Sequence, residues 1–237
     1  MITLDSNTNS SLITQMPAKV TLTNSHVAPW LAPLVYPLGR YFVLPFYFRS
    51  IDVSGQEHLP RSGPTILAPT HRSRWDALML PYATGRHVTG RDLRFMVSAN
   101  EVLGLQGWFI KHLGGFPVDP KHPAIGTLRH GVELLLEKQM LTIFPEGGIF
   151  QDREVHPLKP GLARLALQAE SNHPGLGVKI VPISIRYHPC IPRWGSRVKI
   201  TIGAPLSAAD YSRGGSAKKE AQLLTADLEM ALKENDC

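Results

Sequence analysis

Short apolar runs alternate with amphipathic stretches along most of the chain. The runs are bounded by turn residues and predict strands at 51–55, 65–69, 93–97, 140–144, 179–185 and 198–203. Between them, apolar residues spaced three and four positions apart predict helices at 77–80, 101–113, from 123, from 161, and at 217–235. Strands that alternate with helices are typical of an α/β fold. We therefore predict one domain over residues 50–237, built as a mostly parallel sheet flanked by helices.

The chain before residue 50 does not follow this pattern. Residues 1–26 are polar and rich in Ser, Thr and Asn, which predicts a disordered arm, and they lack the character of a signal peptide. Residues 27–48 are apolar and aromatic, and have the length of a bilayer span, which takes ~20 residues.

Three features of this apolar segment argue against a simple span. Arg40 would be costly at the bilayer centre, several prolines interrupt helical hydrogen bonding, and the Trp and Tyr rings prefer the membrane interface. We predict that residues 27–49 form broken helical pieces that lie in the membrane surface. The alternative is a helix that packs on the protein's own core.

The charge of the chain narrows its partners. The net charge is +6 and the pI is about 9.4, which favours anionic partners such as nucleic acid, an anionic membrane or a phosphorylated substrate. No nucleic-acid-binding motif is present, so nucleic acid is not predicted. The two cysteines, Cys190 and Cys237, form no disulfide framework and no zinc-binding spacing, which favours a reducing compartment and no bound metal.

His71 stands where the predicted strand at 65–69 gives way to a helix, a usual place for ligand sites in open α/β sheets. On one straight helix, His71 and Asp76 would point about 140° apart, because each residue turns ~100°. They can meet only if the chain bends between them. A carboxylate on one ring nitrogen would fix the tautomer and leave the other nitrogen to accept a proton. The alternative is an ordinary loop histidine with Asp76 as a helix cap.

A second candidate segment, Phe144-Pro145-Glu146-Gly147-Gly148, ends the predicted strand at 140–144. A glycine such as Gly147 lets the backbone approach a ligand closely. Glu146 is suited to bind a substrate hydroxyl or to hold a neighbouring cation. An ordinary strand-exit turn would have the same composition.

Cations accompany both segments. Arg72 and Arg74 place positive charge beside His71, and Lys159 precedes a predicted helix, where backbone donors also favour anions. A solvated basic surface is an equal alternative for Lys159.

Two further segments are irregular. Residues 114–119 form a glycine turn that leads into a short extended piece. Pro182 lies inside the apolar run 179–185 and lacks a ladder donor, which predicts an edge strand or a bulge.

These four segments, taken in order, resemble the glycerolipid acyltransferase family. The blocks are His71-(four residues)-Asp76, then Gly114-Gly115-Phe116-Pro117-Val118-Asp119, then Phe144-Pro145-Glu146-Gly147, then Val181-Pro182-Ile183. The resemblance covers roughly residues 50 to 205. A single block would be weak support, but four in order make the resemblance specific.

The resemblance implies a reaction and roles for these residues. His71 would take the proton from an acceptor hydroxyl, which attacks the thioester of acyl-CoA or an acylated carrier protein, and Asp76 would orient the imidazole. Glu146 and Gly147 would shape the acceptor site, and Pro182 would belong to the wall near the acyl donor. The donor thioester is the only cofactor-like molecule implied. The protein would work on the cytoplasmic face of a membrane, and the acyl chain would reach the site from the lipid.

Two departures from the family pattern concern the acceptor. The glycine block usually ends in arginine, but Pro120 stands here with Lys121 beside it, and the F-P-E-G block continues Gly148-Ile149-Phe150 instead of Thr-Arg-Ser. Such arginines grip a substrate phosphate. The cations available to replace them are Arg72, Arg74, Lys121, Arg153 and Lys159.

The leading prediction is therefore acylation of 1-acyl-sn-glycerol-3-phosphate, a lysophospholipid, to phosphatidic acid. An acceptor without a phosphate is the first alternative. A non-catalytic lipid-binding membrane protein is the second, although the intact His71 and Asp76 argue against it.

Overall fold

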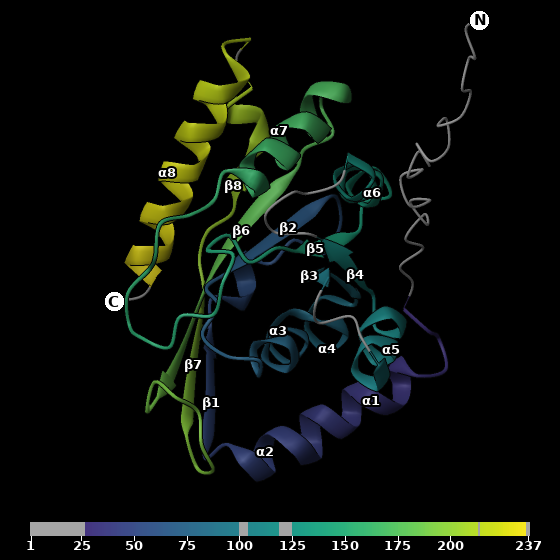
Figure 1. Cartoon of the computed structure of the whole chain (residues 1–237), viewed down its shortest axis with the longest axis vertical. Coiled ribbons are helices and arrows are strands. Elements are labelled where there is room, and N and C mark those ends of the chain that lie inside the picture. Colours follow the sequence, from purple (N-terminus) through teal and green to yellow (C-terminus); the bar gives the residue numbers. More distant parts are fainter. Residues whose placement is uncertain (1–26, 100–103, 119–124, 213, 236–237) are drawn as a thin grey trace, which may run out of the picture.

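One eight-stranded sheet runs through the computed structural model, which describes residues 27–99, 104–118, 125–212 and 214–235 (Figure 1). The strands are β1 (Ser50–Ser54), β2 (Thr65–Pro69), β3 (Leu93–Ser98), β4 (Gly115–Val118), β5 (Met140–Thr142), β6 (Lys179–His188), β7 (Arg197–Ile202) and β8 (Leu206–Ser207). Their order is β1-β7-β6-β2-β5-β3-β4, and β8 pairs with β6. Among the strands of the described residues, only the pairings of β6 with β7 and with β8 are antiparallel. The predicted mostly parallel α/β sheet is confirmed.

Helices cover both faces of the sheet (Figure 1). They are α1 (Ala32–Leu38), α2 (Leu44–Tyr47), α3 (Asp76–Thr84), α4 (Arg86–Thr89), α5 (Gly104–His112), α6 (Ile125–Leu136), α7 (Gly161–Asn172) and α8 (Ala217–Asn235). The buried residues of α8 recur three and four positions apart, as the sequence pattern predicts.

The period of two along each strand divides the core between these helices. On β2, Ile66 packs in the cluster shared with α6, α7 and α8, whereas the adjacent Leu67 packs in the cluster shared with α2 and α3. Every residue of β2 is buried, because helices lie on both faces. The carboxyl end of this strand is therefore held rigidly.

Residues 27–49 form a helical run along one end of the molecule. A π-helical segment, Gly39–Val43, joins α1 to α2. Leu44 and Phe48 are buried on this run while Phe42 and Phe46 are exposed, so one of its faces packs on the core and the other does not. Arg40 points into the protein and donates to the Tyr82 carbonyl oxygen at 2.8 Å.

Two sequence predictions concern a helix that spans a bilayer and the arm before residue 27. Within the described ranges, no helix combines the length and apolar character needed to cross a bilayer. The arm predicted for residues 1–26 lies outside the described residues.

The structure corrects the predicted edge position of Pro182. Its strand, β6, lies inside the sheet between β7 and β2 rather than at an edge. The Pro182 carbonyl oxygen accepts from the Gly203 amide, so the missing donor faces the same side. On that side β6 changes partner, from β8 at Lys179–Ile180 to β7 from Ile183 onward. The proline is tolerated because it lies where the ladder is already interrupted.

Candidate active site

His71 and Asp76 meet at the carboxyl end of β2. The chain leaves β2, bends through residues 70–75 and begins α3 at Asp76, and the His71 Nδ1 atom lies 2.9 Å from Asp76 Oδ2. The bend that the sequence spacing required is therefore present. The His71 ring stacks on Phe144 with centroids 3.9 Å apart, and its side chain is 20% exposed.

The Asp76 carboxylate is fully buried and surrounded by donors. Its Oδ2 atom also accepts from the backbone amides of Arg72 at 2.7 Å and Ser73 at 2.9 Å. Its Oδ1 atom accepts from the Tyr187 hydroxyl at 2.7 Å. Burial, with the nearby Asp76 charge and this hydrogen bond, raises the pKa of the Tyr187 phenol, so Tyr187 remains a donor at physiological pH. Asp76 thus both caps the bend and orients His71.

These contacts fix the imidazole tautomer. An ionised carboxylate only accepts hydrogen bonds, so the proton that His71 shares with Asp76 belongs to Nδ1. In this tautomer, Nε2 is the nitrogen that can accept a proton. The backbone of His71 is also held, because its amide donates to Glu146 and its carbonyl oxygen accepts from the Phe150 amide. The arrangement can accept a proton at a fixed position.

The structure assigns Arg72 and Glu146 to a buried ion pair. Arg72 Nη1 lies 3.0 Å from both Glu146 carboxylate oxygens, and Nη2 donates to the Glu154 carbonyl oxygen. Glu146 also accepts from the His156 amide. Neither residue is among the described residues that line the cavity beside His71. Each charge is neutralised by the other, and of the two roles considered for Glu146 the structure shows the cation-holding one. The predicted substrate contacts of Arg72 and Glu146 stay predictions.

Gly147 and Lys159 lie together on the cavity wall. Gly147 has φ +71°, and a Cβ atom there would lie only 2.6 Å from Lys159 Nζ. Only glycine fits both the left-handed backbone and the neighbouring ammonium group. Within the described part of the chain, Lys159 forms no ion pair, and its side chain is exposed.

The cavity beside His71 has a volume of about 580 Å³, within the usual range for ligand sites. Its walls come from residues 35–44 of the helical run, α3, α5, the carboxyl ends of β3 and β5, and α7. Apolar side chains dominate, and none of the described lining residues is acidic. The cations on its wall are Arg40, Arg74, Arg86 and Lys159.

The three remaining predicted residues lie in different places. Arg74 lines the cavity and is exposed, and its contact with substrate stays a prediction. Pro182 is buried and lines no part of this cavity, because it precedes the end of β6 that faces the site. Lys121 lies outside the described residues.

Sequence reasoning missed Tyr187 as part of the site, and it missed the contact that Phe144, inside the second candidate segment, makes with His71. Tyr187 is 111 positions from Asp76, and only its apolar-facing place in the run 179–188 hinted that its hydroxyl needs a buried partner. Phe144 was read as the end of a strand, but β5 ends at Thr142 and the Phe144 ring stacks on His71.

For the acyl transfer that the family resemblance implies, replacing Tyr187 with phenylalanine should lower kcat severalfold. The KM values for the acyl donor and for the acceptor should stay unchanged. The change removes one donor from a buried carboxylate, which costs ~1–3 kcal/mol, and loosens Asp76 without touching the cavity. Steady-state kinetics and urea unfolding measure the two effects. Tyr211→Phe is the matched control, because Tyr211 donates to Asp227 at 2.8 Å away from the site. A kcat equal to that of the control would contradict a positioning role for Tyr187.

An apolar cavity with cations on its wall, beside a histidine–aspartate pair at the carboxyl end of β2, suits acyl transfer, and the sequence comparison agrees. The model of the acyltransferase family matches residues 50–186, so the chain belongs to that family.

Particular relatives are named glycerolipid enzymes or acyltransferases. The 1-acyl-sn-glycerol-3-phosphate acyltransferase of Bacillus subtilis is 26% identical over 193 residues, which cover 78% of this chain and 87% of that protein. An uncharacterized acyltransferase of Schizosaccharomyces pombe is 36% identical over 98 residues, 40% of this chain, but the match spans only 14% of that much longer protein.

A solved structure shares the fold. The crystal structure of the 1-acyl-sn-glycerophosphate acyltransferase PlsC from Thermotoga maritima aligns with a TM-score of 0.64 at 20% identity. The alignment covers 86% of this chain and 79% of that one.

Proposed function

We propose that this protein is an O-acyltransferase that moves a fatty acyl group from acyl-CoA or acyl carrier protein to the hydroxyl of a lysophospholipid, with 1-acyl-sn-glycerol-3-phosphate as the acceptor. The observation that carries the proposal is the His71–Asp76 pair at 2.9 Å, with His71 on the wall of a large apolar cavity. The named activity of the B. subtilis relative supports the choice of acceptor.

The reaction is a direct transfer. The acceptor hydroxyl oxygen forms a bond to the thioester carbonyl carbon, and its proton moves to His71 Nε2. The carbon–sulfur bond then breaks, and the imidazolium returns the proton to the leaving thiolate. Asp76 stabilises the imidazolium through Nδ1 while it is charged. The apolar walls accommodate the fatty acyl chain.

The acceptor phosphate would be held by Lys159 and Arg74. Both line the cavity, and together they supply the charge that the two missing family arginines would bring. Arg40 and Arg86 also line the cavity, where Arg40 donates to the Tyr82 carbonyl oxygen and Arg86 pairs with Asp92. Gly147 would let the acceptor approach the backbone beside Lys159.

A second acceptor class is an alcohol or lysolipid without a phosphate. The observation that favours it is the burial of Arg72 against Glu146, which removes one expected phosphate ligand from the cavity. The two classes differ in their need for Lys159.

We further propose that the protein works at the cytoplasmic face of a membrane, with residues 27–49 as a membrane-associating segment of the domain at 50–237. Supporting this, residues of the helical run line the cavity on one side and are exposed on the other. A lipid in the bilayer would then meet the cavity at its wall.

Purified protein supplied with radiolabelled acyl-CoA and a panel of acceptors tests the function. We expect product with 1-acyl-sn-glycerol-3-phosphate and much less with monoacylglycerol. Equal transfer to the phosphate-free acceptor would favour the second class. No transfer to any lysolipid or alcohol, either from acyl-CoA or from a radiolabelled acyl carrier protein supplied in its place, would reject the enzyme.

Replacing Lys159 with alanine should raise the KM for 1-acyl-sn-glycerol-3-phosphate about tenfold, because a charge-assisted contact to the phosphate is lost. The KM for acyl-CoA should stay unchanged. Lys219→Ala, on the exposed start of α8, is the matched control. If both lysine variants keep the wild-type KM, Lys159 is not the phosphate ligand.

A further inference from the structure

The loop that joins β6 to β7, residues 189–196, is bound to the end of the helical run. The Gly195 amide donates to the Tyr47 carbonyl oxygen at 2.8 Å, and the Arg49 amide donates to the Ser196 carbonyl oxygen at 2.9 Å. The Trp194 ring meets the Phe46 ring edge-on, with centroids 4.4 Å apart. Figure 1 shows this loop beside α2 at the lower end of the molecule. We call residues 189–196 the hairpin tip.

The hairpin tip exposes large apolar side chains. Ile191 and Trp194 are each 61% exposed, and Phe46 beside them is 71% exposed. A monomeric soluble protein rarely gathers such side chains without a partner. The tip is held in place by the backbone bonds above, so these side chains are presented on a fixed support.

The exposed side chains continue along the helical run. Trp30, Leu34, Leu38, Phe42 and Phe46 recur every fourth residue, and each is at least 54% exposed. On an α-helix that spacing drifts about 40° per step. The π-helical segment Gly39–Val43, whose wider turn bonds the Leu44 amide to the Gly39 carbonyl oxygen, takes up part of the drift. The exposed row therefore reaches the hairpin tip along one side of the molecule.

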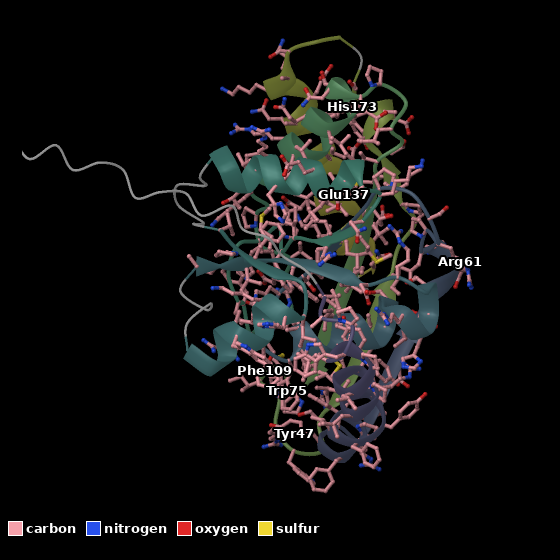
Figure 2. The ribbon with its side chains drawn as sticks, turned by 90° about the vertical axis from the view of Figure 1, so that its right-hand side faces the viewer. Tyr47, Arg61, Trp75, Phe109, Glu137 and His173 are labelled. Carbon is pink, nitrogen blue, oxygen red and sulfur yellow. The ribbon has the colours of Figure 1, made fainter. Side chains whose placement is uncertain are left out.

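The far end of the row meets α5. The Trp30 ring lies 6.2 Å from Trp108, and Trp108 and Phe109 are 39% and 40% exposed. In Figure 2, Tyr47, Trp75 and Phe109 lie toward the same end of the molecule, away from His173. The helical run is thus flanked by aromatic pairs at both ends.

The charge of this surface selects the partner. None of the segments 27–49, 104–113 and 189–197 contains an aspartate or glutamate. Arg49, Arg193 and Lys111 are exposed beside the apolar rows. Apolar and aromatic side chains bordered by cations, with no acidic residue, suit the headgroup region of an anionic bilayer.

We propose that the hairpin tip is a second membrane-inserting element, distinct in sequence from residues 27–49, that binds the surface of an anionic lipid bilayer. Ile191 and Trp194 enter the interface, and Arg193 contacts the lipid phosphates. The hairpin tip supports one end of the helical run and the exposed rings of α5 support the other. Together they fix the tilt of the cavity wall against the membrane. This inference rests on the proposed work on membrane lipids, but it predicts binding that is measured without any acyl transfer.

Binding of the full chain to vesicles of phosphatidylglycerol and phosphatidylcholine tests the inference. Trp194→Ala and, separately, Ile191→Ala should each weaken the vesicle partition coefficient about tenfold, the effect of losing one large apolar side chain from the interface. Arg193→Gln should reduce binding to anionic vesicles and leave binding to pure phosphatidylcholine unchanged. The matched controls are Leu223→Ala and Met230→Ala, which are 55% and 54% exposed on the distant helix α8.

Ile191 is aliphatic and takes no part in the ring contact between the hairpin tip and α2, so its replacement leaves that contact intact. Thermal unfolding checks that every variant folds. Quenching by lipids brominated along the acyl chain should be smaller for Trp194→Phe than for the wild type. Equal partitioning of the tip variants and the α8 controls overturns the inference. So does a lipid-free dimer that Trp194→Ala dissociates, since the tip would then bind a second copy of the chain.

The proposed function is tested apart from this, with the acceptor dissolved in detergent micelles. If the wild type transfers acyl groups in micelles and the tip variants retain that activity, the function stands whatever the vesicles show. If the wild type is inactive in micelles but the tip variants lose vesicle binding, the function fails and the tip inference holds.

Discussion

Replacing His71 with alanine is expected to lower the kcat for acyl transfer ~10²–10⁴-fold, the usual contribution of a general base. The imidazole is held from two sides, by Asp76 at Nδ1 and by the Phe144 ring against its face, so the variant loses a base that is held in a fixed position. Single-turnover measurement with saturating acyl-CoA isolates this step from product release.

The KM values separate this loss from a loss of binding. His71 does not carry the acceptor phosphate or the acyl chain, so the KM for each substrate should change little. The matched control is His173→Ala, at the end of the molecule far from Trp75 in Figure 2. Turnover of the His71 variant at the wild-type rate would remove the enzyme mechanism as described.

Replacing Arg72 with methionine is expected to lower the free energy of unfolding by ~3–5 kcal/mol, the usual cost of leaving one member of a buried ion pair behind. The side chains of Arg72 and Glu146 are 3% and 0% exposed, so the carboxylate left behind cannot be solvated. Urea unfolding at neutral pH measures the change.

Arg129→Met supplies the comparison for this experiment. Arg129 pairs with Glu133 one turn along α6, but those side chains are 80% and 48% exposed. Such a surface pair contributes ~0.3–0.5 kcal/mol. Equal losses for the two arginine variants would mean that the Arg72–Glu146 pair does not carry the stability assigned to it.

The Arg72 variant should also reduce activity. Glu146 accepts from the His71 amide at 2.8 Å, so the ion pair holds the backbone on which the base is mounted. This explains how a glutamate that makes no described contact with the cavity can belong to the site. Its hydrogen bond holds the His71 backbone.

Local patterns were sufficient for most of the elements. The predicted strand at 65–69 and helix at 217–235 have the observed limits of β2 and α8. The boundaries that differ have tertiary causes. The strand predicted to reach 144 ends at Thr142 because Phe144 turns toward His71, and the strand predicted to end at 185 continues to His188 because β7 pairs with it.

The candidate site likewise combines a contact that local spacing predicts with contacts that it does not predict. The spacing of His71 and Asp76 within one strand-to-helix junction was enough to predict that they could meet, because the chain between them is short. No local pattern identifies the partner of Tyr187 or shows that Arg72 points at Glu146. Those contacts join residues more than 70 positions apart.

By itself, the sequence determined what depends on neighbours along the chain: the alternation of strands and helices, the bend after β2, the glycine at Gly147 and the apolar segment before residue 50. The tertiary structure alone decided which charges are neutralised inside the protein and which reach the cavity. It also placed Pro182 inside the sheet and brought the hairpin tip to α2. The physical reason is that periodicity reports the environment of one element, whereas the partner of a buried charge or an exposed ring depends on the order in which the strands assemble.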